Sequence, residues 1–140
     1  MKLSEFARIF NSYRDSFSGL GLTLAEANDY SRRYRKPNAY DLQFETEPND
    51  DGLMISICGE FSKQEWLELG LLTTSIDVDG TTGVRLLGIP ENIDVIVSSV
   101  LNFLDNHSTK LLEDSDFYVR AYHEQKQKWL KDNNLSSFGD

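Results

Sequence analysis

The chain has 140 residues, of which 39% are hydrophobic and 26% are charged, and it contains 9 glycines, 3 prolines and 1 cysteine. This length and composition predict a single globular domain over residues 1–140 and exclude disordered, collagen-like and disulfide-stapled proteins. The 23 acidic residues outnumber the 14 basic ones, and the net charge of -9 argues against nucleic acid as a direct ligand, because the phosphate backbone attracts the opposite charge.

Two helices are expected at the start of the chain. Apolar residues recur there at three- and four-residue spacing, which predicts a helix over about residues 4–17. Thr23 and Glu26 match a capping box, in which two side chains satisfy backbone donors at the start of a helix. A second helix is therefore predicted over residues 24–35, ended by Pro37.

The hydrophobic period then changes to two. Apolar and polar residues alternate over residues 40–45 and 53–57, and the segment 47–52 between them has the composition of a turn. This pattern predicts a β-hairpin. Ser62 and Glu65 match a second capping box, so a short helix is expected after the hairpin.

The second half of the chain is predicted to contain two short strands and two helices. The strands are expected over residues 74–78 and 84–86. A broad apolar stripe predicts a helix from residue 93 to about residue 107, and charge placement predicts a last helix over about residues 114–131. Adjacent hairpins favour an antiparallel sheet, so we predict an α+β fold: about four strands in two hairpins, packed against N-terminal and C-terminal helices.

The negative charge is concentrated in the middle of the chain. Residues 41–116 contain 16 acidic and 3 basic side chains, a formal charge of -13. Such a one-signed region steers a basic partner toward it, although a solvated surface that keeps the protein soluble would look the same. The candidate partner-binding residues are Glu45, Glu47, Asp50, Asp51, Glu60, Glu65, Glu68, Asp77 and Asp79. The basic run over residues 32–36 is interpreted as the positively charged end of the second predicted helix.

Few residues offer catalytic or metal-binding chemistry. His107 is expected at the end of a helix and His123 in the middle of one, which favours structural or solvated roles. Asp77 and Asp79 have the spacing to hold a divalent cation, but the same residues suit a hairpin turn. Cys58 has apolar and acidic neighbours, which raise a thiol pKa, so we expect it to be inert. We therefore predict no catalytic residues, no metal and no cofactor.

The sequence also bears on the compartment. A single cysteine excludes an intramolecular disulfide, and the charged N-terminal segment lacks the apolar run of a signal peptide. No apolar stretch approaches the roughly 18 residues of a membrane span. A cytoplasmic location without membrane association is expected.

Three functions fit these patterns. The favoured one is a non-enzymatic acidic domain that binds a basic protein, such as an immunity protein or inhibitor that neutralises a nuclease toxin. The first alternative is a secretion-chaperone-like protein that binds an extended effector segment. The second is a small enzyme that uses a carboxylate pair, such as Asp77 and Asp79. The sequence does not predict the oligomeric state.

Overall fold

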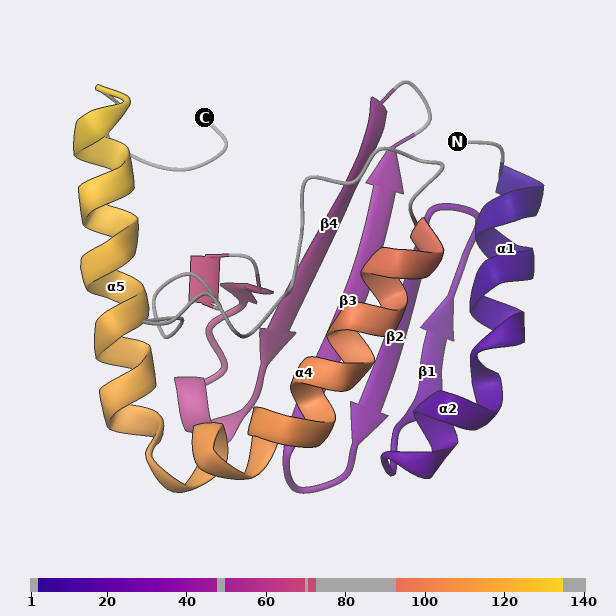
Figure 1. Cartoon of the computed structure of the whole chain (residues 1–140), viewed down its shortest axis with the longest axis horizontal. Helices are drawn as coiled ribbons and strands as arrows, with labels where there is room; N and C mark the ends of the chain where they lie inside the picture. The colour runs from indigo at the N-terminus through magenta and orange to yellow at the C-terminus, as the bar shows by residue number, and fades with distance from the viewer. Residues whose placement is uncertain (1–2, 48–49, 70, 73–92, 135–140) are drawn as a thin grey trace.

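Five antiparallel strands form one sheet, in which each strand lies beside its neighbours in the sequence (Figure 1). The computed structural model describes residues 3–47, 50–69, 71–72 and 93–134. The strands are β1 (Thr23–Ala27), β2 (Ser31–Lys36), β3 (Tyr40–Glu47), β4 (Asp50–Cys58) and β5 (Leu67–Glu68). The helices are α1 (Leu3–Ser12), α2 (Arg14–Gly19), α4 (Ile93–Glu113), α5 (Ser115–Asp132) and the short 3-10 helix η1 (Glu60–Ser62). The predicted α+β fold is confirmed.

Helices cover one face of the sheet. Figure 1 shows α4 running across the front of the strands, with α1 and α2 on the side of β1 and β2. The strands alternate accordingly: Leu42 and Phe44 of β3, and Ile55 and Ile57 of β4, are fully buried, and the residues between them are more exposed. This alternation confirms the predicted hairpin, because a period of two places every second side chain against the helices.

Aromatic rings from the helices and the sheet form the centre of the core. The ring of Phe17 stacks on Tyr34 with a centroid distance of 3.9 Å, and Phe10 lies 4.8 Å from Phe44. All four side chains are at most 5% exposed. These contacts join α1 and α2 to β2 and β3, so the N-terminal segment is an integral part of the fold.

The helix predicted over residues 24–35 is wrong, because this segment forms the hairpin of β1 and β2. The connection is a turn in which the side chain of Asn28 accepts a hydrogen bond from the backbone N–H of Tyr30 at 2.8 Å. Asn side chains stabilise such turns by bonding to the backbone two residues ahead. Arg32 and Tyr34 are both buried, which is the period of a strand and follows from packing against α1 and α2.

The apparent capping box of that segment serves the sheet instead. The hydroxyl of Thr23 donates to the carbonyl oxygen of Arg35 across the hairpin at 3.4 Å. Glu26 pairs with Arg33 of β2, with 3.5 Å between Oε2 and Nη1. Both interactions join neighbouring strands, so the spacing of two polar residues by three positions was a misleading helix signal here.

The short helix predicted after Ser62 is wrong over residues 63–68, where a tight turn leads from η1 into β5, and helical residues begin only at Leu69. The Ser62 hydroxyl accepts from the backbone N–H of Gly59 at 3.2 Å and donates to the carbonyl oxygen of Glu65 at 2.7 Å. Lys63 and Gln64 have φ values of 53° and 65°, in the left-handed region. Two consecutive residues in that region end the 3-10 turn and prevent a continuing helix.

The other predicted helices lie where they were expected, but their first and last residues differ from the prediction. The first predicted helix is divided at Tyr13 into α1 and α2. The helix expected over residues 93–107 is α4 and extends to Glu113, so His107 lies inside it and not at its end. The last helix is confirmed as α5. The strands expected over residues 74–78 and 84–86 lie outside the described residues, and β1, β2 and β5 were not predicted as strands.

The last helix packs at the β5 edge of the sheet. The buried Tyr122 accepts a hydrogen bond from the backbone N–H of Glu68 at 3.2 Å, and His123 Nε2 lies 3.0 Å from Glu65 Oε2. These two contacts attach α5 to β5 and to the turn that precedes it. Within the described residues, no helix has the length and apolar content needed to cross a membrane.

The buried tyrosines predict a loss of stability at alkaline pH. Burial raises the pKa of Tyr34 and of Tyr40 from 10.0 to about 12, against smaller opposing effects of Arg32 and Ser108. Because the folded protein holds these phenol protons more tightly than the unfolded chain does, the stabilisation is complete below pH 10 and is lost as the pH rises through 12. Urea unfolding across this range measures the loss of stability, and its dependence on pH should be about half as steep in Tyr40→Phe, because only one of these two buried phenols remains. An equal slope in both proteins would refute this explanation.

Candidate protein-binding surface

One end of the β3–β4 hairpin extends beyond the rest of the sheet. The last pair between β2 and β3 joins Ser31 to Glu45, whereas β3 and β4 continue to a pair formed by Glu47 and Asp50. On the other side, β5 pairs only with the opposite half of β4. Figure 1 shows this end of the hairpin above β1 and β2. We call its described residues, 45–47 and 50–51, the acidic ribbon, and the acidic ones are Glu45, Glu47, Asp50 and Asp51.

The ribbon carries its charge at defined register positions. Glu45 is exposed and pairs with Met54 of β4, whose side chain is 58% exposed. Four of the five residues of the ribbon are acidic, and the sequence contains no Lys or Arg between residues 37 and 62. The hairpin itself therefore supplies no positive side chain to neutralise these carboxylates.

The other predicted acidic residues lie at the opposite end of β4 or outside the described residues. Glu60 is exposed in η1, but Glu65 pairs with His123, and Glu68 accepts a hydrogen bond from the backbone N–H of Leu71 at 2.8 Å. The nine residues of β4 span about 27 Å at the rise of a strand, so this group and the acidic ribbon are separate. Asp77 and Asp79 are outside the described residues.

The sheet face opposite the helices carries paired charges of both signs. Arg33 donates two hydrogen bonds to Gln43 Oε1, at 3.2 and 2.9 Å, in addition to its pairing with Glu26. Its guanidinium also lies 5.2 Å from the centre of the Trp66 ring, in a cation–π contact. The basic run over residues 32–36 is thus part of a strand, and its interpretation as a helix end is wrong.

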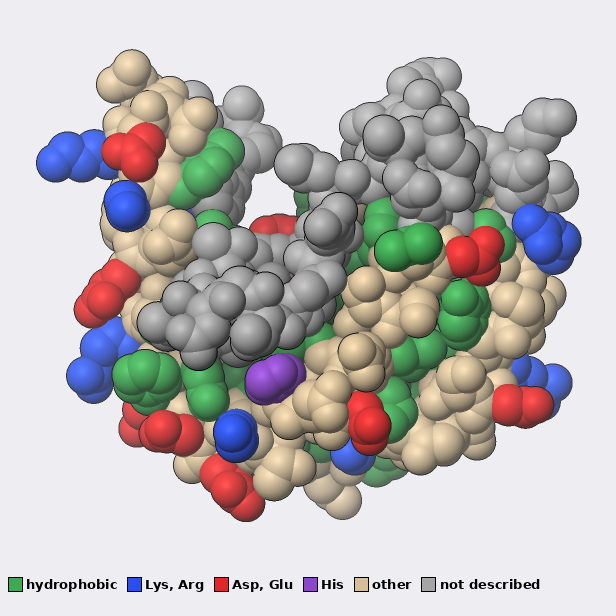
Figure 2. Space-filling model, in the orientation of Figure 1, with side chains coloured by type: hydrophobic (Ala, Val, Ile, Leu, Met, Phe, Trp, Pro, Cys, Tyr) green, Lys and Arg blue, Asp and Glu red, His purple; other side chains and the backbone are tan. Residues whose placement is uncertain are grey.

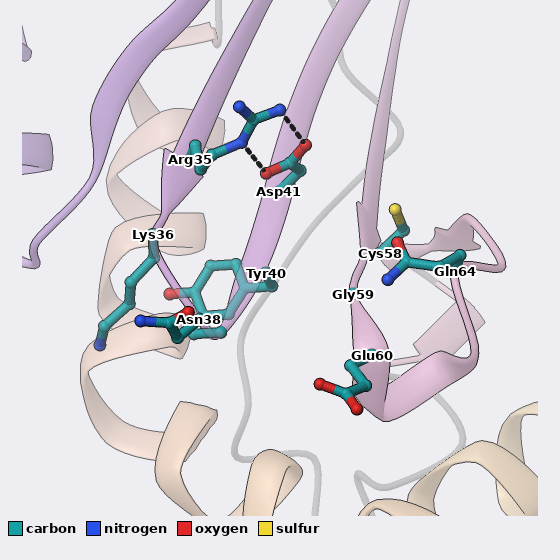
Figure 3. A pocket seen from close by; sticks show the side chains of 10 residues that line it. Arg35, Lys36, Asn38, Tyr40, Asp41, Cys58, Gly59, Glu60 and Gln64 are labelled. Carbon is teal, nitrogen blue, oxygen red and sulfur yellow. Dashed lines mark hydrogen bonds and ion pairs between the residues drawn. The ribbon is translucent and has the colours of Figure 1, made fainter.

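A polar pocket of about 290 Å³ lies at the η1 end of this sheet (Figure 3). Arg35 and Asp41 form a bidentate pair across it, at 2.9 and 3.1 Å. Cys58 beside them is 7% exposed, and burial, with a smaller contribution from Asp41, raises the pKa of its thiol. The raised pKa agrees with the sequence prediction and makes the thiol a weak nucleophile at neutral pH.

The histidines take part in packing. The ring of His107 stacks on Phe103 with a centroid distance of 5.3 Å, and His123 contacts Glu65 on the neighbouring segment. Among the residues that the structure describes, no group of three or more His, Cys, Asp or Glu side chains lies close enough to hold a metal ion.

Charge on the helical side of the molecule is mixed. In Figure 2, red and blue side chains alternate over the described parts of this face, and neither sign forms a large patch there. Sequence reasoning missed a further feature, a cavity between α2 and β1, because it placed β1 and β2 in a helix. The alternation of buried Arg32 and Tyr34 was the signal that could have revealed it.

Comparison of the chain with protein-family models, with curated proteins and with solved structures finds no match. Charge and geometry therefore carry the assignment of function.

Proposed function

We propose that this protein is a non-enzymatic, cytoplasmic binding domain that captures a basic protein, as an immunity protein or inhibitor of a cationic nuclease toxin does. The observation that carries the proposal is the acidic ribbon, which extends beyond the described neighbouring strands and has four acidic residues among five. A toxin that binds nucleic acid has a basic surface, and an acidic hairpin competes for that surface by the same electrostatics.

The position of the acidic ribbon is suited to binding a partner protein. A two-stranded end of a hairpin contacts a concave partner site without movement of the sheet, and the rest of the sheet holds it in place. Exposed Met54 beside Glu45 adds apolar contact to the charge. Charge accelerates the encounter and fixes its orientation, and desolvation of an apolar side chain at the centre of the contact slows dissociation.

Reversing the charge of the ribbon tests the proposal. In the double variant Asp50→Lys/Asp51→Lys we expect the affinity for the basic partner to fall about 100-fold, mostly through slower association. The melting temperature should remain that of the unmodified protein, because no described strand other than β3 pairs with this part of β4. The partner to use is the purified product of the adjacent gene, since an immunity protein is normally encoded beside its target. Surface plasmon resonance at two salt concentrations measures both rates.

The matched control carries the same change in charge elsewhere. Asp105 and Glu113 are exposed on α4, so Asp105→Lys/Glu113→Lys should change the affinity less than about threefold. Equal losses in both double variants would mean that only net charge matters. A neighbouring gene product that is not basic and does not bind would refute the function itself.

A further inference from the structure

A cavity of about 410 Å³ lies beside β1, between this strand and the helices α1 and α2. Its walls include buried Phe17, Leu22 and Tyr34, and the rim includes Leu24 of β1. Leu24 pairs with Tyr34 and therefore lies on the helix side of the sheet, yet 54% of it is exposed. The helices thus cover β2 and leave the apolar side of β1 open.

The strand beside this cavity has a free edge. β1 stands at the end of the sheet order and pairs with β2 alone among the described strands. All five of its residues are exposed, and it contains neither Pro nor Lys, two residues that commonly block the edges of sheets. Its outward backbone groups are therefore positioned to pair with another strand.

A bulge in β1 determines on which face of the sheet its side chains lie. The register with β2 shifts between Leu24 and Glu26, so that Ala25 is the extra residue. As a result, Leu24 lies on the cavity side, whereas Glu26 lies on the opposite face and pairs there with Arg33. The only acidic residue of β1 is thus kept away from the cavity.

The cavity has positive charge within a protein of net negative charge. Arg14 and Arg32 line it, and none of the described residues that line it is acidic. Arg32 is 9% exposed, its Nη1 donates to the carbonyl oxygens of Asn28 and Ser31, and its guanidinium lies 5.2 Å from the centre of the Phe6 ring, so it contributes fixed positive charge to the wall. Arg14 is exposed and is the guanidinium accessible to a ligand carboxylate. Guanidinium groups bind carboxylates with two parallel hydrogen bonds, so the cavity selects an acidic ligand.

We propose that the β1 edge and this cavity bind an extended peptide from a protein partner, which adds to the sheet as a further strand. Side chains two residues apart in that strand lie on the same face, about 7 Å apart. The ligand is therefore a segment of about five residues with an apolar side chain facing Leu24 and an acidic one, two positions away, facing Arg14 and Arg32. This site is separate from the acidic ribbon and takes a ligand of the opposite charge.

A second copy of this chain does not fit that description. Antiparallel pairing of two β1 strands would offer Leu24 and Glu26 as the apolar and acidic side chains. The bulge places these two on opposite faces, so they do not enter the same cavity. The occupant is thus a segment of a different sequence.

A short synthetic peptide tests the site directly. The probe is acetyl-Thr-Leu-Thr-Glu-Thr-amide, titrated into the full chain and followed by NMR of the backbone amides. We expect shifts and slowed hydrogen exchange at residues 23–27, and about tenfold weaker binding when Lys replaces Glu in the peptide. Two further peptides carry N-methyl groups at alternate residues, one peptide at the odd positions and the other at the even positions. We expect one of the two not to bind, because the amides that would pair with β1 are methylated in it.

Protein variants separate this site from the acidic ribbon. Arg14→Glu should weaken peptide binding at least tenfold, whereas Arg8→Glu, on exposed α1 surface outside the cavity, should leave it unchanged. Asp50→Lys/Asp51→Lys should also bind the peptide normally, whatever its effect on a basic partner. No binding at millimolar peptide, shifts centred elsewhere, equal binding by both N-methylated peptides, or dimerisation through β1 would each overturn the proposal.

Discussion

Replacing Phe44 by alanine is expected to destabilise the protein by about 3–5 kcal/mol, the largest effect of any single substitution considered. Phe44 is completely buried on β3, and its ring lies 4.8 Å from Phe10, 5.9 Å from Phe17 and 6.1 Å from Tyr34. Truncation removes the β3 ring that contacts both N-terminal helices and leaves a cavity among the remaining rings. Urea denaturation followed by circular dichroism measures the change in the free energy of unfolding.

Phe117→Ala is the matched control for that substitution. Phe117 is 58% exposed on α5, so losing the same atoms there should cost less than about 0.5 kcal/mol. If Phe44→Ala also cost less than about 1 kcal/mol, the aromatic cluster would not be the centre of the core.

The sequence correctly predicted those helices and strands whose hydrophobic period matches the burial of their side chains. The β3–β4 hairpin and the helix α4 have buried residues at the expected period, since one face of each packs against the other layer. The segment of β1 and β2 was assigned wrongly because Thr23 and Glu26 resemble a capping box, and local spacing outweighed a short alternation. Contacts between distant residues, such as the stacking of Tyr34 on Phe17, hold that segment in the sheet, and such contacts are not visible in a local pattern.

The same limit applies to the candidate sites. A predicted hairpin places the residues of the acidic ribbon near its turn, so that part follows from sequence. The contacts of Glu65 with His123 and of Glu68 with the backbone N–H of Leu71 do not follow from sequence, because they depend on where α5 and Leu71 lie in space. The cavity beside β1 was hidden for a related reason, since it exists only when α2 and β1 belong to different layers.

Replacing Gly59 by alanine is expected to destabilise the protein by about 2–3 kcal/mol. Gly59 joins β4 to η1, and a Cβ atom there would lie 2.5 Å from the carbonyl oxygen of Ala39 and 3.2 Å from the Cα atom of Tyr40. Both neighbours are backbone atoms, one in the turn before β3 and one in the first residue of that strand. The turn would have to move, and with it the start of β3 and the adjacent pair of Arg35 and Asp41. The φ value of Gly59 is 180°, which any residue adopts, so the cost is steric.

Gly19→Ala isolates this steric effect from the general properties of alanine. A Cβ atom at Gly19, at the end of α2, would meet nothing within 4 Å, and alanine is the better helix former by about 1 kcal/mol. We therefore expect Gly19→Ala to leave the free energy of unfolding unchanged or slightly raised, in the same urea titration in which Gly59→Ala lowers it. If both variants were as stable as the unmodified protein, the close approach of Gly59 to Ala39 would not constrain the fold. That result would also mean that the η1 turn does not determine the register of β3, or the position of the acidic ribbon at the other end of that strand.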